Sequence, residues 1–218
     1  QEAGDRHVMV GFNRRFSPHT ERLRQALAGR SEPLSMTMLV NAGFSPADSW
    51  VHDPNIGGGR IIGEGCHFID LMCYLAGSRV ATVSAGMVGQ GPAVRDDKMA
   101  ITLVLEDGSV GAIQYYSNGA KSYPKEQLVV FSEGRVAHLD NFRRMVGYGF
   151  RGFRKFKTFR MDKGHAAEFA AFTRRVAEGG APLVSLDSLV NVTLASFAAV
   201  TSAAERRTIT LAEEYAAL

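Results

Sequence analysis

Two turns near the middle of the chain constrain its fold more than any other feature. Asp107-Gly108 separates the runs MAITLVLE and SVGAIQYYS, and Glu133-Gly134 separates QLVVFS from RVAHL. The flanking runs are rich in β-branched and aromatic residues, and a dipeptide that ends in glycine between two such runs is typical of a β-hairpin. The centre of the chain is therefore predicted to form an antiparallel sheet.

Further strands and helices are predicted on both sides of these hairpins. Apolar or alternating runs predict strands at 8–11, 34–40, 80–89, 153–161 and 208–211. Helical patterns cover 60–76, 164–179 and 185–205, and another helix has Ser17 as its N-cap, Pro18 in its first turn and Gly29 just past its end. Helices before, within and after about seven antiparallel strands indicate an α+β fold.

The predicted sheet is mainly antiparallel and open, and the helices are expected to cover one of its faces. Several strands are apolar on both sides, for example Ile101 and Leu103 beside Val104. An apolar second face needs a partner. We therefore predict that this face is buried in a homodimer.

Composition places the chain among ordinary globular proteins. It has 218 residues, of which 45% are hydrophobic and 22% charged, and its net charge of +3 implies no polyanionic partner. No apolar run approaches the ~20 residues that span a bilayer. Its two cysteines, Cys66 and Cys73, are too far apart on a helix for a disulfide and have no metal-ligand spacing. Free thiols favour the cytoplasm, and no metal site is predicted.

The predicted helix 60–76 carries polar residues within an apolar segment, GGGRIIGEGCHFIDLMCYLAG. At about 100° per residue, Glu64, His67, Asp70 and Tyr74 share one arc of roughly 120°. One interpretation is a core helix whose histidine and acids satisfy one another. The other is a helix that lines a reaction site. An unpaired buried charge is costly, so a polar face without partners in the fold must meet water or a ligand.

Three stretches of the chain resemble a known family. They are VMVGFNRRFSPH at 8–19, GGGRIIGEGCHFIDL at 57–71 and KGHAAEFAAF at 163–172. They are similar to the last Rossmann strand with its linker helix, the catalytic motif and the closing helix of the glucose–fructose oxidoreductase / inositol dehydrogenase (Gfo/Idh/MocA) family. The chain thus resembles the C-terminal domain of that family.

The resemblance implies a two-domain NAD(P)-dependent oxidoreductase that acts on a sugar, a polyol or a sugar derivative. The family's glycine-rich dinucleotide fingerprint and its E-K-P lysine are not in this sequence. Residues 1–30 are accordingly expected to be a remnant of the Rossmann domain with its linker, and 31–218 the substrate and oligomerisation domain. NAD or NADP is expected in the full-length protein; the isolated chain is expected to bind neither and to be inactive.

Within the matching motif, the resemblance implies that His67 is the general acid or base. The sequence departs from the family pattern at Gly63, which stands where the family usually has an aspartate. Glu64 is the candidate to replace that aspartate, either by orienting the imidazole or by binding a second hydroxyl. A glycine at this position also favours an alternative, a non-catalytic dimerisation or regulatory module that kept the fold.

Other residues are candidates for binding. Substrate contacts are predicted for Arg15, Trp50, His52, Gly59, Lys163 and His165, and a cofactor contact for Arg14. Trp50 and His52 are expected to form the wall of a sugar-stacking pocket. The structural alternative for Arg14 and Arg15 is that they are solvated arginines before a helix, and for His165 that it only starts a helix. For Asp70, capping or pairing within the fold is favoured over catalysis.

The segment 141–163 is rich in arginine and lysine interleaved with aromatic residues. Such a mixture can bind single-stranded nucleic acid. Alternation of Phe with Lys or Arg at period two instead predicts a strand with one apolar and one basic face, and we favour that interpretation. A milder functional version is an arm that reaches a phosphorylated or nucleotide-linked sugar.

Overall fold

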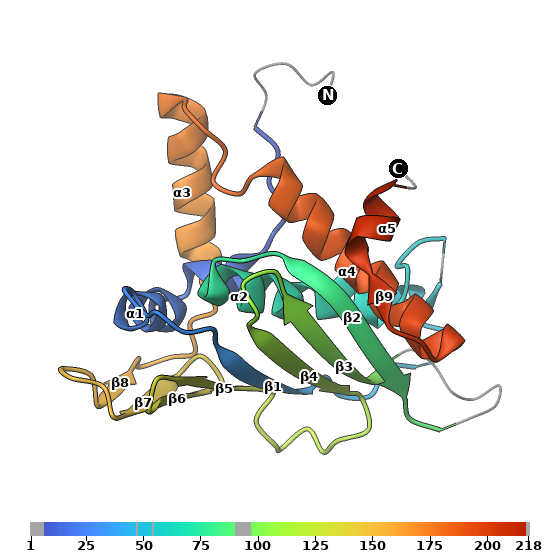
Figure 1. The fold of residues 1–218 in the computed structure, drawn as a ribbon, viewed down its shortest axis with the longest axis horizontal. Helices are drawn as coiled ribbons and strands as arrows, with labels where there is room; N and C mark the ends of the chain where they lie inside the picture. The colour runs from blue at the N-terminus through green and yellow to red at the C-terminus, as the bar shows by residue number, and fades with distance from the viewer. Residues whose placement is uncertain (1–6, 47, 54, 90–96, 217–218) are drawn as a thin grey trace.

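The computed structural model describes residues 7–46, 48–53, 55–89 and 97–216. Its main feature is a nine-stranded sheet with the order β8-β7-β6-β5-β1-β4-β3-β2-β9 (Figure 1). The strands are β1 (Ser35–Asn41), β2 (Val80–Met87), β3 (Lys98–Leu105), β4 (Val110–Tyr116), β5 (Glu126–Ser132), β6 (Arg135–Asp140), β7 (Arg144–Tyr148), β8 (Lys155–Lys157) and β9 (Ile209–Thr210).

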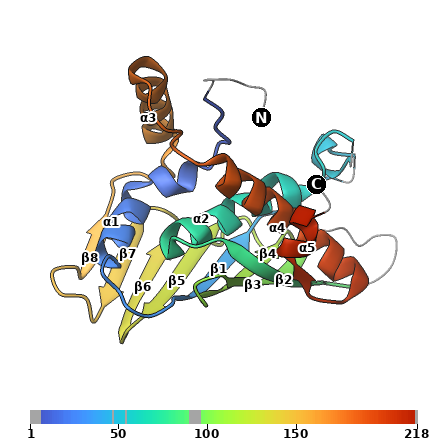
Figure 2. The same ribbon diagram turned by 45° about the horizontal axis from the view of Figure 1, so that its top comes forward.

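The helices are fewer and mostly lie on one side of this sheet. They are α1 (Pro18–Ala26), α2 (Cys66–Ala76), α3 (His165–Glu178), α4 (Leu186–Glu205) and α5 (Leu211–Ala216), with the short helices η1 (Asn13–Phe16), η2 (Trp50–His52) and η3 (Ile61–Gly65). Figure 2 shows α1, α2 and α4 above the sheet, and α3 standing away from it. The α+β prediction with a mainly antiparallel sheet is confirmed.

Both predicted hairpins are present. β3 and β4 pair across Asp107-Gly108, with Leu103 opposite Gly111, and β5 and β6 pair across Glu133-Gly134. Glu133 and Gly134 both have positive φ, 50° and 73°, as a two-residue type I′ turn requires. The exception to the antiparallel order is β1, which runs parallel to β4 and antiparallel to β5. This crossover places the end of β1 beside the start of β5, where the site lies.

The core lies between the sheet and the helix layer. On α2, the side chains of Phe68, Ile69, Leu71 and Met72 are fully buried. Gly111 on β4 lies directly beneath α2, because a Cβ there would come within 2.3 Å of the Met72 sulfur. A side chain at this position would push α2 off the sheet.

α4 is long and apolar enough to cross a membrane by length and composition alone. Half of its most apolar stretch is buried inside the protein, and Asn191 forms hydrogen bonds with the backbone of Val80 on β2. Its apolar character is therefore that of a core helix packed on β2.

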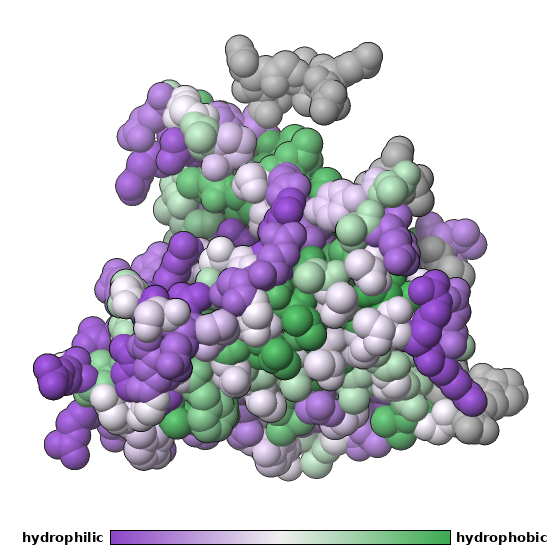
Figure 3. Space-filling view, viewed as in Figure 1, coloured by the Kyte–Doolittle hydropathy of each residue, from purple (hydrophilic) through white to green (hydrophobic). Residues whose placement is uncertain are grey.

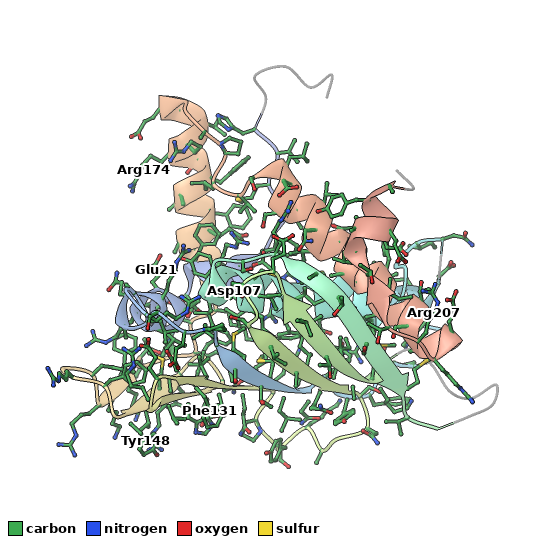
Figure 4. The ribbon with its side chains drawn as sticks, in the orientation of Figure 1. Glu21, Asp107, Phe131, Tyr148, Arg174 and Arg207 are labelled. Atoms are coloured by element: carbon green, nitrogen blue, oxygen red, sulfur yellow. The ribbon has the colours of Figure 1, made fainter. Side chains whose placement is uncertain are left out.

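The opposite face of the sheet carries apolar side chains that are open to solvent. Val110 and Val104 lie opposite one another on β4 and β3, and Phe131 lies opposite Ser35 on β1. Phe131 is 49% exposed and Tyr148 is 60% exposed. Both point away from the helices in Figure 4.

Several local features differ from the predictions. The strand predicted at 8–11 is wrong: these residues pair with no described strand, and Val8 and Val10 are exposed. The strand predicted at 153–161 is shortened to β8, and the basic and aromatic segment 141–163 forms two short strands, β7 and β8, in place of one. α5 was missed. The helix predicted at 60–76 begins with a π-helical turn, η3, before α2.

Candidate functional site

η3 and α2 position the two central side chains of the site. Glu64 lies in the π-helical turn and His67 in the first turn of α2. A π-helical segment advances differently from an α-helix, so the arc drawn for a regular helix does not hold for Glu64. No hydrogen bond joins Glu64 to His67 in the described part of the chain, and the two residues have separate partners.

Glu64 is held by three donors from three parts of the chain. Its carboxylate accepts hydrogen bonds from the Tyr115 hydroxyl at 2.5 Å, the Lys125 ammonium at 2.8 Å and the Arg60 guanidinium at 3.0 Å. Burial opposes its charge, but the hydrogen bonds from Lys125, Tyr115 and Arg60 prevail and lower the pKa of Glu64 to about 2. Glu64 is therefore an ionised anchor for this cluster.

Glu126 forms a second cluster, which sequence reasoning missed. Its buried carboxylate accepts two hydrogen bonds from Arg14, both at 2.8 Å, and one from Lys163 at 2.5 Å. These two cations lower the pKa of Glu126 although burial opposes the effect. The one signal in the sequence was an acid, next to Lys125, at the start of an otherwise apolar strand.

Asp70 pairs with Arg15 beneath the site. The guanidinium of Arg15 donates two hydrogen bonds to the carboxylate, one of them at 2.9 Å, and both side chains are buried. Burial raises the pKa of Asp70, and Arg15 opposes that rise. The prediction that Asp70 pairs within the fold is confirmed, and Arg15 is engaged in that pair.

The imidazole of His67 is half-buried beside Phe12. Its Nδ1 is buried and has no hydrogen-bond partner among the described residues, and its ring meets Phe12 edge-on with centroids 5.8 Å apart. Burial lowers the pKa of His67 to about 4, and the positive charge of Arg14 contributes, although Glu64 and Glu126 oppose it. At neutral pH the imidazole is therefore uncharged and able to accept a proton.

The start of α3 is fixed against η1. Asn13 donates a hydrogen bond to the Lys163 carbonyl at 2.7 Å, and Ser17 donates one to the Asp162 carbonyl at 2.7 Å. A Cβ on Gly164 would come within 2.3 Å of the Asn13 carbonyl oxygen, so the two segments are in close contact. This contact places Lys163 at Glu126, while exposed His165 lies within electrostatic reach of His67.

The loop before η3 holds the remaining predicted residues. Gly58 and Gly59 have φ of 68° and 89°, which side chains rarely adopt. Trp50 is 64% exposed. Both ring nitrogens of His52 are buried without a partner in the described chain, and His52 lies within electrostatic reach of Asp97. No contact of Trp50 or His52 with His67 is found among the described residues.

Dinucleotide and metal binding each need a recognisable arrangement of residues. Pyrophosphate binding needs a strand, a glycine-rich turn and a helix N-terminus in succession, and the described residues contain no such unit. In the same residues, no three His, Cys, Asp or Glu side chains are grouped to bind a metal ion. A cavity of about 830 Å³ lies between β2 and the end of α4 and includes no predicted site residue.

Comparison with models of protein families identifies the family of the chain. The model of the GFO/IDH/MocA C-terminal domain matches residues 18–137, which is more than half of the chain. The chain belongs to this family. The resemblance inferred from the three sequence stretches is thereby confirmed.

Similar proteins include two that are named inositol dehydrogenases. The chain is 27% identical to myo-inositol 2-dehydrogenase of Thermotoga maritima over 222 residues, which cover 94% of this chain and 65% of the relative. It is 28% identical to inositol 2-dehydrogenase of Rhizobium meliloti over 220 residues, with the same coverage. The chain thus spans about two thirds of these relatives' length.

Solved structures share the fold. A probable dehydrogenase from Thermotoga maritima is 25% identical, covers 96% of this chain and 66% of its own, and superposes with a TM-score of 0.73. Levoglucosan dehydrogenase in complex with NADH and levoglucosan is 22% identical, covers 95% of this chain and 67% of its own, and has a TM-score of 0.75. At that identity, the second likeness shows the fold alone.

Proposed function

We propose that the longer protein to which this chain belongs is an NAD(P)-dependent oxidoreductase that oxidises a hydroxyl of a sugar, a polyol or a sugar derivative. The observation that carries the proposal is His67, a half-buried imidazole that is uncharged at neutral pH and lies within electrostatic reach of Glu64, Glu126 and His165. Oxidation of an alcohol requires removal of the hydroxyl proton, and a neutral histidine suits that task. The names of the inositol dehydrogenase relatives support the reaction class.

The charged groups around His67 act on its protonated form in opposite directions. As the imidazole takes up the proton, the nearby carboxylates of Glu64 and Glu126 stabilise the positive ring, whereas Arg14 favours return of the proton. The contact of α3 with η1 brings Lys163 and His165 to the side of the site on which Glu126 and His67 lie. In this proposal they bind substrate together with Trp50, His52 and Gly59, and Arg14 approaches the cofactor.

The proposal assigns dinucleotide binding to another part of the protein. Residues 1–30 would then be the end of a Rossmann domain and its linker, and 31–218 the substrate and oligomerisation domain. Support comes from the apolar side chains of Val8, Val10, Phe169 and Val176, which are all exposed. Figure 3 shows hydrophobic surface on the side of α3 toward the N-terminal segment. Calorimetric titration of the isolated chain with NAD⁺ and NADP⁺ should show no binding.

We further infer that the protein works in the cytoplasm as a homodimer. Cys66 and Cys73 are free thiols, as a reducing compartment allows. The apolar side chains on the open face of the sheet, among them Val104, Phe131 and Tyr148, would be covered by the second copy.

A second candidate function is a non-catalytic dimerisation or regulatory module. Two observations favour it: Gly63 offers no side chain to the site, and the carboxylate of Glu64 is fully engaged by Tyr115, Lys125 and Arg60. The sequence that precedes Gln1 discriminates between the two functions. A strand–GxGxxG–helix unit followed by an E-K-P motif favours the enzyme, and its absence favours the module.

The direct test of the enzyme is turnover by the full-length protein. Neutral and acidic sugars and cyclitols are supplied with NAD⁺ or NADP⁺, and formation of reduced nicotinamide is followed by absorbance. The proposal expects saturable turnover of at least one polyhydroxylated substrate. Absence of turnover across neutral and acidic members of the panel would support the module.

A further inference from the structure

The two carboxylates around His67 are each bound by two cations. Arg60 and Lys125 bind Glu64, and Arg14 and Lys163 bind Glu126. Four cations against two carboxylates leave an excess of positive charge. The nearby Arg15–Asp70 pair is neutral as a unit and does not offset it.

Other titratable groups that face the site reduce this excess without removing it. His67 is uncharged at neutral pH, because burial lowers its pKa to about 4. Glu168 lies within electrostatic reach of Asp70 and Arg15, and its carboxylate removes at most one of the two excess charges. His165 lies within reach of His67 on the exposed side of α3.

The excess charge reaches solvent mainly at one residue. The side chains of Arg14, Arg60 and Lys163 are at most 13% exposed, whereas that of Lys125 is 41% exposed. The Lys125 ammonium has three N–H donors, and in the described structure only one hydrogen bond, to Glu64, engages it. An incoming acceptor can therefore meet this ammonium directly.

A neutral polyol gains little from a partly exposed ammonium in a site with excess positive charge. An anionic group gains Coulomb attraction, which grows as bound substrate excludes water. Lysine acts as a compact point charge and suits a carboxylate or a phosphate group equally.

We propose that the substrate is a polyhydroxylated compound with an anionic group, a carboxylate or a phosphate ester, and that this group binds Lys125 while a hydroxyl faces His67. The inference rests on the proposed function and narrows its substrate class. Lys125 is a specificity residue in this account, and the proton transfer belongs to His67.

The test compares matched acidic and neutral compounds in the full-length protein. The pairs are D-glucuronate with D-glucose, D-galacturonate with D-galactose, and myo-inositol 1-phosphate with myo-inositol, each with NAD⁺ or NADP⁺. The acidic member of the pair that is turned over should have a kcat/KM at least ten times that of the neutral member. Turnover of a uronate would indicate that the anionic group is a carboxylate, and turnover of the inositol phosphate would indicate a phosphate ester.

Variants at Lys125 test whether this residue recognises the anionic group of the substrate. Lys125→Met should lower the ratio of acidic to neutral kcat/KM at least tenfold, and Lys125→Arg should keep it. The ratio of acidic to neutral kcat/KM is measured because loss of the hydrogen bond from Lys125 to Glu64 would reduce turnover of the acidic and the neutral compound alike. Lys121→Met removes a charge from an exposed position in the same loop and should leave the ratio unchanged.

The outcomes separate the two claims. Equal or better turnover of the neutral member, or an unchanged ratio in Lys125→Met, would overturn the anionic substrate and leave the oxidoreductase standing. Absence of turnover of all six compounds would contradict the oxidoreductase, and this inference with it.

Discussion

Tyr115 donates a hydrogen bond from its hydroxyl to the carboxylate of Glu64 at 2.5 Å. Tyr115 is fully buried on β4, so this contact directs Glu64 toward the sheet. The carboxylate that precedes His67 in the sequence thus stabilises the fold around the site, and its influence on the imidazole is electrostatic. This relationship determines what substitutions at Glu64 should do.

Glu64→Gln should affect stability more than catalysis. The neutral amide leaves Arg60 and Lys125 without their anionic partner, and loss of charged hydrogen bonds in a partly buried site costs about 1–3 kcal/mol. Urea unfolding measures this loss. Glu106→Gln, at an exposed ion pair with Arg79, is the control and should cost less than about 1 kcal/mol. Equal stability of Glu64→Gln and the unaltered chain would contradict the anchoring role.

Gly63→Asp should be tolerated by the fold. A Cβ at Gly63 would lie 3.4 Å from the Gly57 carbonyl oxygen, its nearest neighbour, and the backbone there is helical. We expect unchanged unfolding behaviour within about 1 kcal/mol and a higher kcat in the full-length enzyme. Gly164→Ala is the contrasting variant, because its Cβ would meet the Asn13 carbonyl oxygen at 2.3 Å with φ at 89°. If Gly63→Asp unfolded as readily as Gly164→Ala, the space seen beside Gly63 would not exist.

Stability should fall with acid in two separate pH windows. The pKa of His67 is lowered from 6.5 to about 4 by burial, so the unfolded chain binds the proton first. Stability is therefore lost as pH falls from about 6.5 to about 4, by about 3 kcal/mol at most. Buried His19, whose pKa is also lowered by burial, contributes in the same direction. Glu64, with its pKa lowered to about 2, loses its contribution only below about pH 4.5.

Substitution of His67 separates these windows. His67→Gln should flatten the slope of unfolding free energy between about pH 6.5 and pH 4, and leave the slope below that range in place. Denaturant titrations at a series of pH values measure both slopes. An identical slope in the variant would show that the imidazole titrates normally in the folded chain.

The open sheet face should mediate self-association. Phe131→Arg places a charge among the apolar side chains of this face without touching the helix side, so it should shift a dimer toward monomer. Sedimentation velocity of the chain at micromolar concentrations measures the change. Lys121→Glu, in the loop between β4 and β5, is a surface control. A monomeric unaltered chain would contradict the proposed dimer.

Much of the fold was predictable because its signals are local. The turns at Glu133-Gly134 and Asp107-Gly108, the cap at Ser17 and the apolar periods of α2 and α4 each act within a few residues. The strand predicted at 8–11 failed because strand formation depends on a neighbour, and none of the described strands runs beside it.

The site was only partly predictable for a related reason. His67 and Glu64 share a short motif, but the bond of Arg14 to Glu126 joins residues 112 positions apart. The position of Glu126 beside Lys125, at the start of an apolar strand, is too weak a signal to distinguish it from a solvated acid. The π-helical turn at Ile61–Gly65 likewise has no signal in the residue pattern, and it moved Glu64 away from the predicted arc.

The central claim is that His67 takes the proton of the substrate hydroxyl. The most direct measurement is kcat of His67→Ala in the full-length enzyme, with dinucleotide binding and urea unfolding measured alongside. General acid–base groups typically contribute about 10²- to 10⁴-fold in rate, so kcat should fall by that order while dinucleotide binding and a cooperative unfolding transition persist. Turnover of His67→Ala at the rate of the unaltered enzyme would contradict the account and leave His67 a structural residue of α2.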